Sequence, residues 1–117
     1  NQVDNAVKKV IKKGNLTTLN CPEEVFLAEK LLSMHPWAGK VKFARTGGEA
    51  NAISIRIARA ATGKDKVAFC GYHGWHDWYI ANTDLNSGIP EFNRKLAHSF
   101  TYNGLNSLEK IFIILSI

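Results

Sequence analysis

The sequence predicts an α/β fold, with two helices at the amino terminus followed by a strand, a helix and a second strand. Apolar residues recur at helical spacing in residues 3–11 and 25–32. Short apolar runs at residues 41–45 and 66–70 flank a further helical stretch. A crossover helix between two strands is typical of a parallel pair, and hence of an α/β sheet. The 117 residues, 45% of them hydrophobic, are enough for one small domain.

The two amino-terminal helices have distinct start and stop signals. The first carries one apolar stripe and is expected to stop at Gly14, because glycine is common just past a helix end. A polar turn is expected at residues 15–21. The second helix is expected to open at Pro22, where proline suits the first helical position and the two glutamates that follow suit the positive end of the helix dipole. It should end before Pro36, because the residue before a proline avoids the helical conformation.

Periodicity and breaker residues also place the later elements. The expected elements are a strand at 41–45, a helix at 49–62 capped by Gly63, a strand at 66–70 and the start of a helix at 106–110. Residues 82–99 are expected to be irregular, because they are polar and contain Gly88 and Pro90. The apolar run 111–117 is compatible with either a strand or a helix.

Charge, cysteine content and the lengths of the apolar runs indicate which partners and which cellular location to expect. The net charge of +5 suits anionic ligands, but the only dense group of lysines, within residues 8–13, fits the solvated face of a helix better than a nucleic-acid patch. Cys21 and Cys70 lie far apart and form no CxxC pair, which favours two free, buried thiols in a cytosolic protein over a disulfide. No signal peptide and no apolar run of membrane-spanning length are present. We therefore expect a cytoplasmic protein without nucleic-acid or membrane partners.

The turn Thr46-Gly47-Gly48 is the first candidate site. It lies between the expected strand and the helix that follows, at the edge where open α/β sheets bind ligands. Glycines let the backbone approach an anion, and the start of a helix offers unpaired N–H groups and partial positive charge. The Thr46 hydroxyl can add a hydrogen bond, so the turn suits one phosphate group. The alternative is an ordinary strand-to-helix turn, since the loop lacks a GxGxxG pattern and a Walker lysine.

The second candidate site is the loop from Gly71 to Tyr79, which is rich in histidine and aromatic residues. Following the second strand, it is expected at the same sheet edge as the glycine turn. Tyr72 or Trp75 can stack on a flat ring, and His73 can contact it. Two alternatives stay open: packing of the tryptophans with solvated histidines, or a metal held by His73, His76 and Asp77.

Together the two candidate sites resemble a known family. The stretch FARTGGEANAISIRIARAATGKDKVAFCGYHGWHDWY is similar to the class III pyridoxal-phosphate-dependent aminotransferases, the group that includes glutamate-1-semialdehyde aminomutase. In that family a Ser-Gly-Thr-Glu-Ala-like turn opens a helix, and a Tyr-His-Gly triplet follows about two dozen residues later. PEEVFLAEKLL and YNGLNSLEK also resemble the family, so the likeness spans residues 17–110.

The resemblance implies a cofactor site and a fold. Gly47 and Gly48 would donate backbone hydrogen bonds to the phosphate of pyridoxal 5′-phosphate, Tyr72 would stack on its ring, and His73 would support that wall. Gly48 stands where the family often has threonine or serine, and Thr46 is expected to compensate. The implied fold is part of the large cofactor-binding domain of an aspartate-aminotransferase-like (type I) enzyme. Residues 1–117 would form a partial single domain, helical over 1–35 and α/β over 36–117.

The family's chemistry also needs a Schiff-base lysine and an aspartate on the pyridinium nitrogen. No lysine here sits in a matching motif, and IFIILSI after Lys110 does not resemble the family's next stretch. The chain is therefore expected to be an inactive amino-terminal fragment, without catalytic residues or a metal of its own. The full-length enzyme is expected to be a homodimer that moves an amino group between a donor and a carbonyl acceptor. The alternative is a non-catalytic module, or remnant, that binds a phosphorylated ligand.

Overall fold

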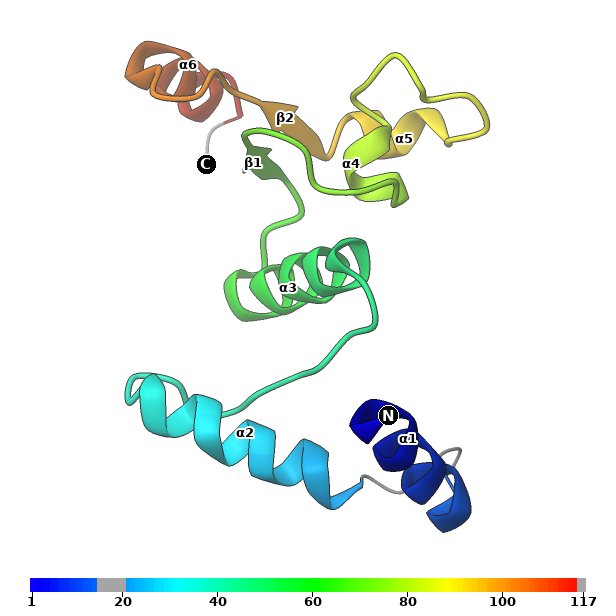
Figure 1. The fold of residues 1–117 in the computed structure, drawn as a ribbon. Coiled ribbons are helices and arrows are strands. Elements are labelled where there is room, and N and C mark those ends of the chain that lie inside the picture. The colour runs from blue at the N-terminus through cyan, green and yellow to red at the C-terminus, as the bar shows by residue number, and fades with distance from the viewer. Residues whose placement is uncertain (15–20, 116–117) are drawn as a thin grey trace. The chain divides into compact units, whose positions relative to one another are not determined.

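The computed structural model describes residues 1–14 and 21–115, which fall into two compact units (Figure 1). The first unit comprises residues 1–42 and the second residues 43–117. The predicted division into a helical part at 1–35 and an α/β part at 36–117 stays a prediction. No helix in the described ranges has the length and apolar character needed to span a membrane.

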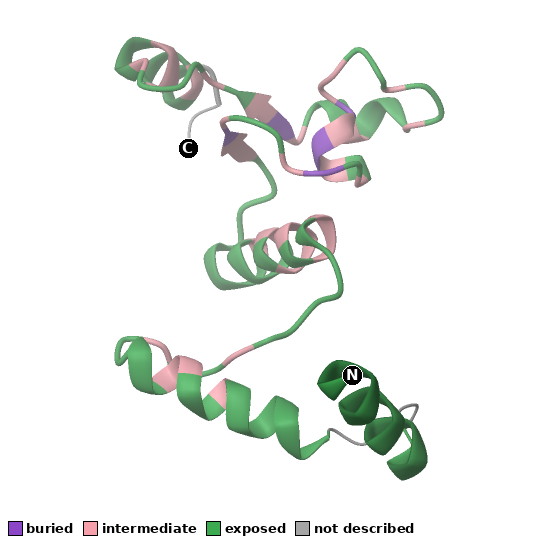
Figure 2. Ribbon diagram, in the orientation of Figure 1, coloured by how far each residue is buried: buried purple, intermediate pink, exposed green. Residues whose placement is uncertain are grey.

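The first unit contains helices α1 (Gln2–Lys13) and α2 (Pro22–Met34), both confirmed from the sequence. Asn1 caps α1 through a capping box with Asp4, and Gly14 ends the helix with a φ of 82°. Proline occupies the start of α2, which ends before Pro36 as expected. The predicted turn at 15–21 lies outside the described residues except for Cys21, which precedes α2 in an extended conformation. Cys21 is exposed and Cys70 only half-buried, so the predicted burial of the two thiols is wrong, whereas both are free as predicted. None of the α1 residues, all of which are described, is buried (Figure 2).

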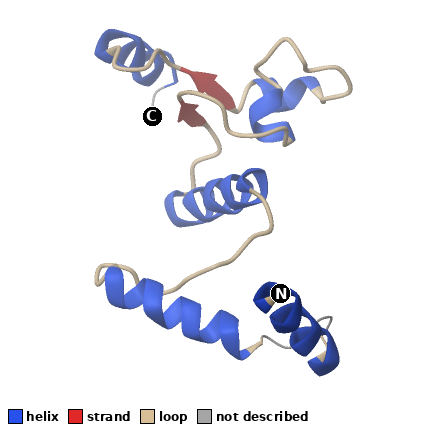
Figure 3. Ribbon diagram, in the orientation of Figure 1, coloured by secondary structure: helices blue, strands red, loops and turns tan. Residues whose placement is uncertain are grey.

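The second unit carries the longest helix and the sheet (Figure 3). Its elements in chain order are α3 (Gly47–Thr62), β1 (Val67–Phe69), α4 (Asp77–Ile80), α5 (Glu91–Arg94), β2 (Ala97–Ser99) and α6 (Leu105–Leu115). Strands β1 and β2 pair in parallel, with Val67 opposite Ala97. Gly63 ends α3 in the left-handed conformation, which confirms the predicted cap.

The predicted strand at 41–45 is wrong, because residues 41–44 have no assigned secondary structure and do not belong to the sheet formed by β1 and β2. A strand needs a neighbour to receive its backbone hydrogen bonds, and β1 pairs with β2 instead. The region 82–99, expected to be irregular, contains α5 and β2. The helix expected at 106–110 continues to Leu115, so the apolar run is helical up to that residue. Residues 116–117 lie outside the described residues.

A small aromatic core lies where the chain leaves β1. Phe69, Tyr79 and Ala97 are buried, and Trp78 packs against them. The Phe69 ring meets the Tyr79 ring edge-to-face, with 5.2 Å between ring centroids. This core anchors both ends of the segment between β1 and α4, which carries the aromatic–histidine loop.

Candidate functional site

A cavity of about 450 Å³ lies between the start of α3 and the loop after β1. Eight residues line it: Thr46, Gly47, Gly48, Asn51, Tyr72, His73, Gly74 and Trp75. All five residues predicted to contact the cofactor are among them. The two candidate sites, more than twenty residues apart in the sequence, therefore form one site in the structure.

The first turn of α3 presents free hydrogen-bond donors to this cavity. Thr46 is the N-cap residue, and its Oγ1 accepts the N–H of Glu49 at 3.2 Å. The Glu49 carboxylate reaches back and accepts the N–H of Arg45 at 2.8 Å. The N–H groups of Gly47 and Gly48 donate to no acceptor in the described part of the chain. Two backbone donors at the positive end of a helix are a favourable place for an anion.

A close contact between two glycines joins the two sides of the cavity. Gly74 has a φ of 103°, and a Cβ built on it would lie 3.0 Å from the Cα of Gly48. Real Cβ atoms essentially never come nearer than this, so a side chain at position 74 would push the loop away from α3. The absence of side chains at both positions sets the width of the cavity.

Tyr72 and His73 lie on the loop side of the cavity and differ in how firmly they are held. The Tyr72 ring is 78% exposed and touches the Tyr79 ring edge-to-face, with 5.7 Å between centroids. The half-buried His73 ring has its Nε2 2.7 Å from the carbonyl oxygen of Cys70. A carbonyl only accepts, so Nε2 carries the proton of that hydrogen bond. Tyr72 thus offers an open ring face, and His73 is a fixed support beside it.

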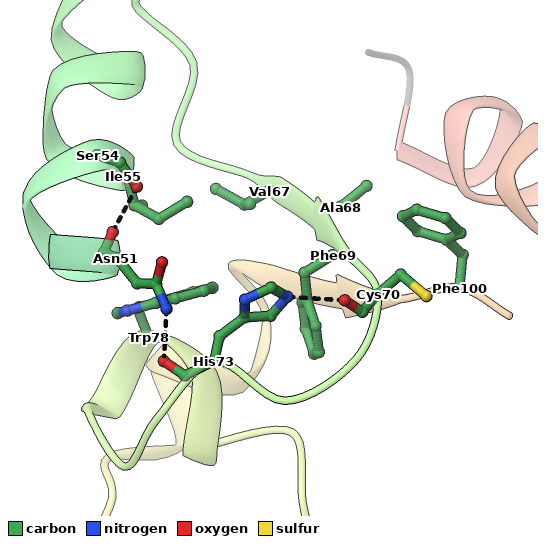
Figure 4. Close-up of a pocket in the computed structure, with 10 residues that line it drawn as sticks. All are labelled: Asn51, Ser54, Ile55, Val67, Ala68, Phe69, Cys70, His73, Trp78 and Phe100. Atoms are coloured by element: carbon green, nitrogen blue, oxygen red, sulfur yellow. Dashed lines mark hydrogen bonds between the residues drawn. The ribbon is translucent and has the colours of Figure 1, made fainter. Parts of the chain in front are cut away.

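Asn51 was missed by sequence reasoning and links the two sides. Its Nδ2 donates to the backbone carbonyl of His73 at 3.2 Å (Figure 4). Asn51 also lines a second cavity of about 360 Å³, bounded in part by His73 and Trp78. The available signal was its spacing, since Asn51 lies one helical turn after Gly47 and so shares its helix face.

The metal alternative receives no support from the described residues. Within residues 1–14 and 21–115, no three histidine, cysteine, aspartate or glutamate side chains gather closely enough to hold a metal ion. His73 directs its Nε2 at the Cys70 carbonyl instead. None of the described residues that line the 450 Å³ cavity is a lysine, so its lining offers no amine for covalent attachment of a ligand.

Replacing Thr46 should weaken the start of α3. Thr46→Ala removes the N-cap oxygen that accepts the Glu49 N–H, and we expect the free energy of unfolding to fall by about 1 kcal/mol. Thr46→Ser keeps the hydroxyl and should behave like the unaltered chain in urea denaturation. Equal stability of the alanine and serine variants would show that the cap is not needed.

Comparison with known proteins places this site in a family. No family model matches the chain. It is 39% identical over 111 residues to the 3-aminobutyryl-CoA aminotransferase of Cloacimonas acidaminovorans, covering 94% of this chain and 26% of that protein. It is 36% identical to the glutamate-1-semialdehyde 2,1-aminomutase of Hyperthermus butylicus, covering 94% of this chain and 28% of that protein. The chain thus spans about a quarter of the length of the curated relatives it matches.

Solved structures agree on the fold. An omega-transaminase from Sphaerobacter thermophilus superposes with a TM-score of 0.80 at 24% identity, over 94% of this chain and 29% of that one. The FumI protein of Sphingopyxis sp. MTA144, solved in its PLP internal aldimine form, gives a TM-score of 0.78 at 29% identity, over 96% and 27%. These structures confirm the predicted α/β fold class. The chain belongs to the class III aminotransferase family, which includes the glutamate-1-semialdehyde aminomutases.

Proposed function

We propose that this chain forms the phosphate- and ring-contacting part of a pyridoxal-phosphate-dependent transaminase or aminomutase. The observation that carries the proposal is that Gly47 and Gly48, whose N–H groups have no acceptor in the described part of the chain, and the exposed Tyr72 line the same cavity. A phosphorylated aromatic cofactor has the two chemical features that these groups recognise. The names of the relatives and the bound form of the FumI protein support the same cofactor.

Each residue of this chain then has a defined task. The N–H groups of Gly47 and Gly48 bind the phosphate, and the positive end of α3 adds to the attraction. The Thr46 oxygen already accepts the Glu49 N–H, so its own proton is left to donate to the phosphate. Tyr72 orients the ring by stacking, and His73 is held by the Cys70 carbonyl as a rigid support.

The bound cofactor supplies the covalent attachment of amines and the electron sink of the reaction. This chain's residues bind and orient, because the described lining of the cavity contains no lysine. We propose that the full-length protein adds a lysine and an aspartate from outside these 117 residues. On this proposal the isolated chain does not turn over.

The proposed partners are a small-molecule amino donor and a carbonyl acceptor. We also propose that the full-length protein is a homodimer, with α1 and residues 82–100 as candidate contacts. The exposed apolar side chains of α1, among them Val3, Val7 and Ile11, support this, because apolar stripes of this kind are usually covered. The proposed location is the cytoplasm, where the free thiols of Cys21 and Cys70 would stay reduced.

The test begins with the nucleotide sequence of the source locus beyond the codon for Ile117, read in all three frames. We expect it to continue into an aspartate-bearing strand and then a lysine loop. The full-length protein should then show the visible absorbance of bound pyridoxal phosphate, whereas the 117-residue chain should bind it weakly or not at all. A full-length protein without that absorbance would contradict the proposal. A stop codon after Ile117, with no other reading frame that encodes the missing parts, would favour the alternative, a non-catalytic module that binds a phosphorylated ligand.

A further inference from the structure

The imidazole of His76 occupies the space beside Gly48. A Cβ built on Gly48 would lie 2.9 Å from both Cε1 and Nδ1 of His76. Such a distance is shorter than real Cβ contacts, so any side chain at position 48 would collide with the ring. The ring therefore fills the volume into which a side chain at position 48 would project.

The backbone of His76 is held in place, and its ring has an aromatic neighbour. It is the N-cap residue of α4, and its carbonyl accepts the N–H groups of Tyr79 at 2.9 Å and Ile80 at 3.0 Å. Tyr79 belongs to the buried aromatic core, which fixes α4 in turn. The imidazole also lies against the Trp75 ring, with 5.3 Å between centroids and a tilt of 37°. Both its backbone and one face of its ring are thus restrained.

The buried Nδ1 of His76 indicates that ring packing determines this arrangement. Nδ1 has no hydrogen-bond partner in the described part of the chain, although it is fully shielded. A shielded, unpartnered nitrogen is unfavourable by itself, so no hydrogen bond of Nδ1 holds the ring in this place, and packing is left to hold it. His76 does not line the 450 Å³ cavity and so acts from behind the glycine turn.

We propose that His76 is a positioning residue for the phosphate-binding turn. Its ring takes the place of a side chain at position 48 and holds the Gly47–Gly48 backbone against Gly74, which keeps both N–H donors facing the cavity. The identity of the anion as a phosphate rests on the proposed function. The steric coupling of His76 to Gly48 does not, because it follows from the contacts alone.

The coupling can be measured in the 117-residue chain with a double-mutant cycle. The variants are Gly48→Ser, His76→Ala and the two combined. His98→Ala is the matched control, because among the described residues the His98 ring hydrogen-bonds to the nearby Lys95 carbonyl and not to the glycine turn. Gly48→Ser should lower the unfolding midpoint by about 4–8 °C. The combined variant should recover at least half of that loss, since the serine enters the space that His76 vacates. Simple addition of the two single effects would overturn the proposal.

Amide NMR supplies a second readout that does not depend on a stable serine variant. His76→Ala should shift the Gly47 and Gly48 amide signals, His98→Ala should leave them in place, and His76→Phe should keep them close to their original positions because it preserves the ring. Unchanged Gly48 signals in His76→Ala would also overturn the proposal. Titration with inorganic phosphate then tests phosphate binding by the turn separately from the positioning role of His76. Coupling without any phosphate-induced shift would support the role of His76 alone, because the isolated chain is expected to bind the cofactor weakly or not at all. The proposed function is decided by the absorbance of the full-length protein.

Discussion

Gly74→Ala is expected to lower the free energy of unfolding by about 2–6 kcal/mol and to open the cavity. Two separate costs combine at this position. The φ of 103° is a conformation that residues with side chains rarely adopt, which costs roughly 1–3 kcal/mol. The added Cβ would also lie 3.0 Å from the Cα of Gly48, and overpacking of this kind costs about 1–3 kcal/mol more. Urea denaturation of the variant and the unaltered chain measures the sum.

Gly71→Ala is the matched control for this prediction. Gly71 lies in the same loop with a φ of 84°, but a Cβ built there meets nothing within 4 Å. The Gly71→Ala variant therefore has the cost of the positive φ but no collision of the added Cβ with a neighbouring atom. The difference between the two variants isolates the contact between Gly74 and Gly48. Equal losses in both would show that the loop does not press against α3.

Phe69→Ala is expected to lower the free energy of unfolding by about 3–5 kcal/mol. The Phe69 side chain is only 8% exposed, and its ring meets those of Tyr79, Trp78 and His73 edge-to-face. Removing it leaves a cavity at the centre of a core with few buried members. Folded domains have only about 5–15 kcal/mol of stability to lose. The loss of near-ultraviolet circular dichroism should therefore occur at a much lower urea concentration.

Phe92→Ala removes the same number of atoms from an exposed site. Phe92 is 66% exposed, and we expect its replacement to change stability by less than about 0.5 kcal/mol. Phe69→Ala should also release the His73 ring, which a merely exposed phenylalanine would not do. If both variants unfold at the same urea concentration, the aromatic core does not stabilise the second unit.

Helices α1, α2 and α3 were predictable because their signals are local, whereas the short helices α4 and α5 were not predicted. Asn1 and Gly14 bracket α1, Pro22 opens α2, and Thr46 and Gly63 bracket α3, and each acts on backbone groups within a few residues of itself. The sheet was not predictable in the same way. Residues 41–45 have strand-like composition but no partner, whereas the mixed sequence Ala97-His98-Ser99 forms β2 because β1 lies beside it. Strand pairing depends on distant residues that periodicity does not reveal.

The same difference between local signals and tertiary contacts applies to the functional site. The five residues predicted from Thr46 to His73 gather around one cavity, and their contact with a cofactor stays a prediction. The roles of Asn51, Gly74 and His76 were out of reach, because they arise from the approach of the loop to α3 at distances near 3 Å. The sequence indicated which residues are chemically suited to the site. The structure identified the residues that keep them in position.

The pairing of β1 with β2 encloses residues 70–96 in a single closed loop that carries Tyr72 and His73. Closing a flexible loop of this length costs about 3 kcal/mol of chain entropy. A three-residue parallel ladder offers few hydrogen bonds to offset that cost, so burial of Phe69, Tyr79 and Ala97 must offset most of it. A ligand that contacts both α3 and Tyr72 would stabilise the closed loop further, by an amount that grows with its concentration relative to its dissociation constant.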